Sequence, residues 1–152
     1  MTAKEIMVTD FPVIPAQTPI EEAVRLLRTN HDESHLHASP GFIVVNDKGD
    51  LAGILSPLTI IRALVEVSSE KTVVSQAVKP SLEELCGLIR GKTVEDLMDW
   101  QPISVTEDAN ILDVAELFVK NRFQRIPVVR GKKVIGIIYR SRLLFCMTPC
   151  FK

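Results

Sequence analysis

One residue pattern occurs twice along this chain, and this internal repeat restricts the fold more than any other feature of the sequence. The matched segments, first copy and then second, are 2–7 with 93–98, 42–45 with 126–129, and 51–55 with 134–138. A repeat of this length predicts two copies of one supersecondary unit that pack against each other. Two units that face each other leave a cleft between them, and such clefts are where small ligands usually bind.

The length and composition are those of an ordinary globular protein. The chain has 152 residues, of which 46% are hydrophobic and 24% are charged, so we expect one compact domain or two small ones that share a core. The net charge of −1 disfavours a general nucleic-acid or acidic-membrane binder, because such binding needs a basic surface.

The sequence also predicts the compartment in which the protein works. The N-terminal residues contain no long apolar run, so we expect no secretory signal, and no stretch of about 18 apolar residues could span a membrane. The three cysteines, Cys86, Cys146 and Cys150, lack the spacing of a disulfide scaffold. Reduced thiols in the cytoplasm are the simplest interpretation.

Each copy is predicted to contain an opening turn, an extended segment, a helix, two strands and a closing helix, in that order. In the first copy, Thr18-Pro19 is a typical helix start, and 46–50 separates two β-rich runs as a hairpin loop does. Ser56-Pro57 begins the closing helix. From helical spacing, we expect its buried side to hold Leu58, Ile61, Leu64 and Val65.

The region between the copies has its own pattern. Residues 68–78 form a connector of uncertain structure. Ser81 with Glu84 is a capping box, which predicts the start of a short helix. The residues expected on the inward side of that helix are Leu82, Leu85 and Ile89.

This doubled β-α-β-β-α unit, with Pro127-Val128-Val129 before its hairpin loop and Gly136-Ile137-Ile138 after it, resembles the cystathionine-β-synthase (CBS) domain pair. Order, spacing and duplication agree over nearly the whole chain except the connector. The resemblance implies an α/β (α+β) fold in which two tandem units pack pseudo-symmetrically through their sheets. The units are expected at 1–67, with a polar insertion at 30–41, and at 92–152, with the connector and its short helix at 68–91.

The resemblance also implies a function. Members of the family commonly dimerise and act as non-catalytic sensors. The implied ligand, bound between the units, is an adenosine nucleotide (AMP, ADP or ATP), another phosphorylated small molecule, or S-adenosylmethionine. Its binding is expected to alter a regulated protein. The dimer faces implied here are the helices with Ile60-Ile61 and Leu143-Leu144-Phe145. Because the sequence contains no catalytic motif, we do not expect an enzyme.

The family's ribose-binding motif, Gly-x-x-Thr/Ser-x-x-Asp, is altered in both copies. In the first copy Ser56 fits the motif, but Thr59 replaces the Asp. In the second copy Tyr139 replaces the hydroxyl residue and Arg142 replaces the Asp. A lost bidentate acceptor costs on the order of 1.5–3 kcal/mol. These departures favour an alternative function, a ligand-free module that docks a protein partner.

Three arginines of the second copy suggest an anion pocket. Arg125 precedes Ile126-Pro127, where the family often places a basic residue against phosphate. Arg140 and Arg142 lie in the predicted first turn of the closing helix, whose free amides favour anions and whose dipole opposes a cation. The equally weighted alternative is that these arginines are solvated surface charges or partners of nearby acids.

The candidate ligand-binding residues come from both copies. Val13 and Ile14, with Ser104 and Val105, would line the adenine side by analogy with the family, although alone they indicate a core. Ser56 is also explained as a helix N-cap, which is the stronger interpretation. The full predicted set is Val13, Ile14, Val44, Ser56, Thr59, Ser104, Val105, Arg125, Ile137, Tyr139, Arg140 and Arg142.

Two further features have alternative interpretations. His31, His35 and His37 share one insertion and could bind a divalent metal, but an exposed polar loop explains them better. Trp100 could stack on a ligand base or anchor a dimer contact, although a lone tryptophan more often covers the edge of a core.

Overall fold

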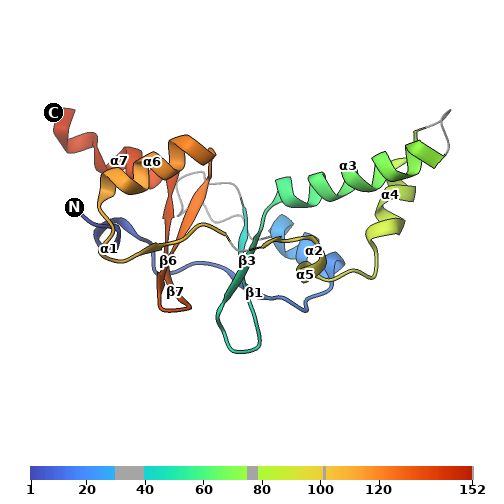
Figure 1. Cartoon of the computed structure of the whole chain (residues 1–152), viewed down its shortest axis with the longest axis horizontal. Helices are drawn as coiled ribbons and strands as arrows, with labels where there is room; N and C mark the ends of the chain where they lie inside the picture. Colours follow the sequence, from blue (N-terminus) through green and yellow to red (C-terminus); the bar gives the residue numbers. More distant parts are fainter. Residues whose placement is uncertain (30–39, 75–78, 101, 152) are drawn as a thin grey trace.

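The computed structural model describes residues 1–29, 40–74, 79–100 and 102–151. It contains two sheets with helices packed around them (Figure 1). The helices are α1 (Ala3–Ile6), α2 (Ile20–Thr29), α3 (Pro57–Val74), α4 (Leu82–Ile89), α5 (Val94–Leu97), α6 (Ile111–Asn121), α7 (Arg140–Cys146) and the 3-10 helix η2 (Thr148–Phe151). The strands are β1 (Val13–Pro15), β2 (Phe42–Val45), β3 (Leu51–Leu55), β4 (Asp99–Trp100), β5 (Val105–Thr106), β6 (Arg125–Arg130) and β7 (Lys133–Tyr139). None of the helices in these described ranges is long and apolar enough to cross a membrane.

The two sheets repeat the same connection, which confirms the predicted fold class. In the first sheet β1 pairs parallel with β2, and β2 pairs antiparallel with β3. In the second sheet β5, β6 and β7 pair in the same way. A parallel pair needs a crossover, and α2 and α6 lie in the two crossovers. Gly49 and Gly131, with φ of 78° and 62°, allow the two hairpin loops to turn.

The opening segments are exchanged between the two repeats. Ala3 and Ile6 of α1 are buried in the hydrophobic core of the second repeat, whereas Val94 of α5 and Met98 are buried in that of the first. Strand β4 continues this exchange, because it joins the first sheet beside β3. Each core is therefore completed by a segment from the other repeat, and the predicted boundaries of the units remain a prediction.

The two sheets face each other across a third hydrophobic core, which confirms the pseudo-symmetric packing. Ile43 of β2 meets Ile137 and Tyr139 of β7 in this core, and each of the three is at most 3% exposed. Side chains alternate along a strand, so the neighbours Phe42 and Val44 point instead into the first core. The hairpins also touch, since the amide of Leu51 donates a hydrogen bond of 2.9 Å to the carbonyl of Lys132.

The buried face of α3 differs from the predicted one. Leu58, Ile61 and Val65 are 63%, 54% and 59% exposed, although their helical spacing predicted burial. The buried residues of its described part are instead Thr59 and Ala63, which are 3% and 5% exposed. Apolar residues occur around much of this helix, so periodicity alone did not decide which side would be covered.

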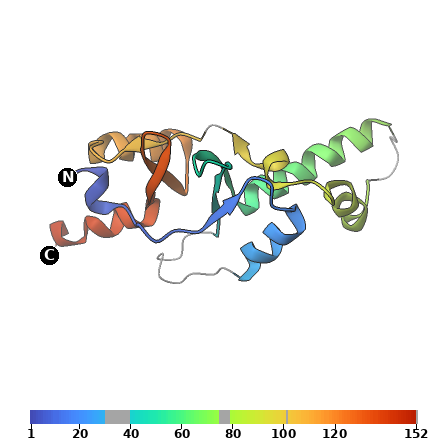
Figure 2. The same cartoon turned by 90° about the horizontal axis from the view of Figure 1, so that it is seen from below.

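The predicted connector is partly helical. Helix α3 continues through residue 74, while 75–78 lie outside the described residues. The predicted cap of α4 is confirmed, because the amide of Glu84 donates to the Ser81 hydroxyl at 3.2 Å. Ile89 is buried as expected, but Leu82 is 66% exposed, so its predicted inward position was wrong. Helix α3 extends away from the sheets and α4 lies beside its far end (Figure 2).

Candidate functional site

The second repeat places a buried arginine against an aromatic ring. Arg125 begins β6 and is the direct cross-strand partner of Tyr139, the last residue of β7. The guanidinium carbon lies 5.6 Å from the ring centroid, which is a cation–π distance. Arg125 is only 6% exposed. Burial lowers the pKa of Arg125 below its ordinary value, and the nearby Tyr139 offsets part of this effect. The arginine nevertheless remains charged near neutral pH.

Gly41 brings the first repeat up to this arginine. A Cβ atom at Gly41, just before β2, would overlap the Arg125 guanidinium. The absence of a side chain at Gly41 therefore permits a close approach between the two repeats. A positive charge is thus held where the start of β2 meets β6 and β7, a position from which it could attract an anionic ligand that contacts both repeats.

The other two arginines of the predicted anion pocket differ from Arg125 in their exposure. Arg140 and Arg142 are exposed in the first turn of α7. The amide of Arg140 donates to the carbonyl of Gln124 at 3.0 Å, which ties the start of α7 to the segment before β6. The structure thus separates one buried arginine from two solvent-exposed ones.

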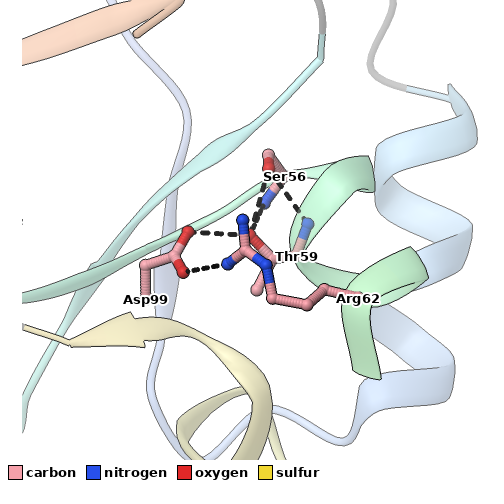
Figure 3. Close-up of polar contacts among 4 residues, drawn as sticks. All are labelled: Ser56, Thr59, Arg62 and Asp99. Carbon is pink, nitrogen blue, oxygen red and sulfur yellow. Dashed lines mark hydrogen bonds and ion pairs between the residues drawn. The ribbon is translucent and has the colours of Figure 1, made fainter. Parts of the chain in front are cut away.

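A polar cluster in the first repeat joins α3 to β4 (Figure 3). The Thr59 hydroxyl donates to Oδ2 of Asp99 at 3.0 Å, and Nη1 of Arg62 donates to Oδ1 of the same carboxylate at 2.8 Å. The hydroxyls of Ser56 and Thr59 are 3.1 Å apart. Because Thr59 is almost fully buried, its hydroxyl needs partners, and one of them, Asp99, comes from the second repeat.

Sequence reasoning missed half of this cluster. Ser56 and Thr59 were predicted as ligand contacts, but Arg62 and Asp99 were not considered. The sequence gives little indication of this contact, because Thr59 and Asp99 are 40 residues apart. The informative clue is the residue after the opening turn, which is Asp99 in the second copy but Val8 in the first.

A pocket of about 450 Å³ lies beside the first sheet. Its lining combines apolar, acidic and amide side chains: Ala16, Gln17, Asn46, Asp47, Leu51, Ala52, Glu95 and Trp100. The Gln17 amide donates to Glu95 at 2.5 Å across this wall. Trp100 is 58% exposed, so its ring borders the pocket instead of filling a core.

Several of the predicted apolar ligand-binding residues are core residues. The side chains of Ile14 and Val44 lie in the first core and that of Val105 lies in the second. Val13 is 47% exposed, and Ser104 is half-buried. Their contact with a ligand remains a prediction.

The predicted metal ligands cannot be placed. His31, His35 and His37 lie outside the described residues. Among the residues that are described, no group of three or more His, Cys, Asp or Glu side chains could hold a metal ion. Metal binding by the histidine insertion therefore remains a prediction.

Comparison with known proteins matches this architecture. The model of the CBS domain matches residues 3–66 and 94–148, which together exceed half of the chain. CBSX1, a chloroplastic CBS domain-containing protein of Arabidopsis thaliana, is 29% identical over 95% of this chain and 60% of its own length. An uncharacterised protein of Methanocaldococcus jannaschii is 27% identical over 95% of this chain and 89% of its own length.

Solved structures show the same fold. The crystal structure of CBSX2 in complex with AMP aligns with a TM-score of 0.70 and 24% identity, covering 99% of this chain and 98% of that one. A CBS domain-containing protein from Kribbella flavida aligns with a TM-score of 0.68 and 28% identity, covering 97% and 98%. The chain spans 60% of CBSX1 and 56% of CBSX2 as full-length proteins.

Proposed function

The chain belongs to the CBS domain family, and we propose that it is a regulatory module that binds an adenosine nucleotide or another phosphorylated small molecule between its two repeats. A bound ligand would contact both repeats and shift their relative orientation. It can do so only as far as it binds one arrangement more tightly than the other. The proposal includes no catalytic step, and it places the protein in the cytoplasm as a homodimer that acts on a regulated partner.

The observation that carries this proposal is the position of Arg125. The residue is 6% exposed, and its guanidinium lies against the Tyr139 ring and next to Gly41. A buried charge is costly unless polar or charged groups compensate it. An anionic group of a ligand would add such compensation, and phosphate is well suited because a guanidinium can bind it through two parallel hydrogen bonds.

Related proteins indicate which ligands to test first. CBSX2 was crystallised with AMP, and the CBS pair of the protein MJ0100 with 5′-methylthioadenosine and S-adenosylmethionine. These ligands belong to those proteins, and the likeness to them shows the fold. They nevertheless define a short list of probes that share an adenosine group and differ in charge.

The test is a calorimetric titration of the purified protein with AMP, ADP, ATP and S-adenosylmethionine. We expect at least one of them to bind, and Arg125→Met to reduce the affinity about tenfold or more through loss of a charge-assisted contact. Arg130→Gln is the matched control, because Arg130 is exposed and paired with Glu107. The thermal midpoint of each variant without ligand shows whether it is folded. Absence of binding by the wild type, or equal binding by Arg125→Met, contradicts the proposal.

The second candidate function is a ligand-free docking module. The observation that favours it is a set of exposed apolar side chains on α3 and α7, combined with the absence of the motif's Asp from both repeats. The exposed residues are Leu58, Ile61, Val65, Leu144 and Phe145. Exposed apolar patches often mark protein interfaces. A protein that ignores all four adenosine ligands but self-associates through these helices would favour this function.

A further inference from the structure

The Asp99 carboxylate is bound in the manner of an anionic ligand. Its two oxygens are held by two different donors, the Thr59 hydroxyl at 3.0 Å and the Arg62 guanidinium at 2.8 Å (Figure 3). Thr59 is 3% exposed, so its hydroxyl is fixed in place. A buried hydroxyl beside a guanidinium is a donor set that suits any anion with two oxygens, a phosphate included.

The fold does not require this arrangement. In the second repeat, Val8 takes the place of Asp99 and pairs with Ile137 through two backbone hydrogen bonds of 2.7 and 2.9 Å. Counting from the matched glycines Gly53 and Gly136, the positions of Thr59 and Arg62 are occupied there by Arg142 and Phe145. One opening segment is therefore held on its sheet without any carboxylate, which makes the Asp99 contacts an addition particular to the first repeat.

The contact is also accessible to solvent and weak enough to exchange. The side chains of Arg62 and Asp99 are 51% and 47% exposed. Ion pairs that are this exposed contribute little stability, because water and salt screen them. An anion with more charge than one carboxylate could therefore compete with Asp99 for the same donors.

Displacement of Asp99 would loosen a defined element. Asp99 is one of the two residues of β4, which pair with Ile54 and Gly53 at the edge of the first sheet. A strand this short has few hydrogen bonds, so loss of the Asp99 contacts would remove one of the restraints on β4. The other residue is Trp100, the only tryptophan of the chain. Its fluorescence would therefore report directly on β4.

We propose that the Asp99 carboxylate occupies an anion-binding site of the first repeat, formed by the Thr59 hydroxyl and the Arg62 guanidinium, and thereby blocks this site to other anions. Ser56 contributes by contacting the Thr59 hydroxyl. An external polyphosphate binds there only by displacing the carboxylate, and this displacement frees the Asp99 side chain and changes the surroundings of the neighbouring Trp100. The proposal goes beyond the ligand site at Arg125, because it uses a different donor set in the other repeat.

The test is a titration with inorganic pyrophosphate, followed by Trp100 fluorescence and by calorimetry. In Asp99→Asn the side chain keeps its shape but loses its charge, so we expect pyrophosphate to bind about tenfold or more tightly than to the wild type. Arg62→Gln should weaken binding by a similar factor. Glu107→Gln is the control for net charge, because it removes one acid from an exposed pair with Arg130 and should leave the affinity unchanged.

Each other outcome overturns the proposal. Equal affinity of the wild type and Asp99→Asn would show that the carboxylate does not compete, and no binding by Asp99→Asn would show that the donors form no anion site. Binding that survives Arg62→Gln would place pyrophosphate elsewhere. The failure of the Arg125 site would look different, since it would abolish adenosine-ligand binding without changing the response of Asp99→Asn to pyrophosphate.

Discussion

The Arg125 guanidinium carbon lies 5.6 Å from the centroid of the Tyr139 ring, and the two residues are direct cross-strand partners in β6 and β7. Both are almost fully buried. The sequence departs from the family's motif at Tyr139, and the structure shows what the larger side chain does there. It provides an aromatic face for the arginine that lies between the two repeats.

This relationship predicts different effects for two substitutions of Tyr139. Tyr139→Phe keeps the ring, whereas Tyr139→Leu removes the face that attracts the guanidinium. A desolvated cation–π contact contributes about 2 kcal/mol or more, so we expect the leucine variant to be less stable than the phenylalanine variant by at least about that amount. Urea unfolding at neutral pH measures the difference. Equal stability of the two variants would show that the ring face contributes nothing.

Gly53 is predicted to tolerate no side chain. A Cβ atom there would lie 2.6 Å from both the Asp99 carbonyl oxygen and Sδ of Met98. The methionine can move, but the carbonyl belongs to the backbone of β4. We therefore expect Gly53→Ala to lower the free energy of unfolding by about 1–3 kcal/mol, the usual cost of overpacking.

Gly87→Ala is the matched control for that substitution. Gly87 lies within α4, and a Cβ atom there would have no neighbour within 4 Å. Replacing a glycine inside a helix by alanine should stabilise the protein by about 0.5–1 kcal/mol. The two alanine variants should thus change the urea midpoint in opposite directions. A shift of the same sign in both would contradict the predicted close approach of β4 to β3.

The start of α5 should make stability depend on acid. The Asp96 carboxylate accepts hydrogen bonds from the Thr93 amide at 2.8 Å and the Thr93 hydroxyl at 3.1 Å. The amide contact is the larger cause that lowers the pKa of Asp96 below its ordinary value, and the hydroxyl contact is the second. The stabilisation is therefore complete above the unfolded-state pKa of about 3.9, and it is lost as the pH falls through the lower folded-state pKa.

The measurement compares urea unfolding of the wild type and Asp96→Asn from pH 7 down to values below the unfolded-state pKa of Asp, about 3.9. The variant should be less stable at pH 7, and the difference between the two proteins should shrink as the pH falls below about 4. A difference that stayed constant from neutral to acid pH would show that the charge of Asp96 is not what stabilises the turn.

Local signals explain which parts of the fold the sequence predicts. The hairpin loop around Gly49 and the cap at Ser81 depend on neighbouring residues, so they could be recognised from short segments. The repeat then implied the second unit from the first. The pairing of two similar units through their sheets followed from the family resemblance, and the packing of Ile43 against Ile137 confirms it.

Long-range choices explain what could not be predicted. Nothing in the four residues of α1 specifies which of two similar cores Ile6 will enter, and the structure places it in the core of the other repeat. The hydrogen-bond partner of Thr59 could not be predicted either, because the local sequence does not specify which repeat an opening segment packs against. Thr59 stands at the position of the motif's acid, and the carboxylate that it contacts, that of Asp99, arrives through the same exchange of opening segments.

The exposed face of α3 leads to a prediction about assembly. Leu58, Ile61 and Val65 lie three and four residues apart, so they share one side of the helix, and all are more than half exposed. We expect the wild type to be a homodimer that buries this side. Ile61→Glu should raise the dissociation constant about a hundredfold or more, because a carboxylate would be buried without a partner.

Sedimentation velocity over a range of protein concentrations measures this effect. Val119→Glu is the control, because this substitution also replaces an apolar side chain by an acid. Val119 lies on α6 and is 80% exposed. The substitution should leave the dimer intact, since Val119 lies outside the proposed face. Dissociation by both variants would indicate a general effect of charge, and a wild type that is monomeric at all concentrations would contradict the assembly. Loss of the dimer in Ile61→Glu alone would assign the interface to α3. This helix begins beside the Ser56–Thr59 contact, and Thr59 in turn contacts Asp99.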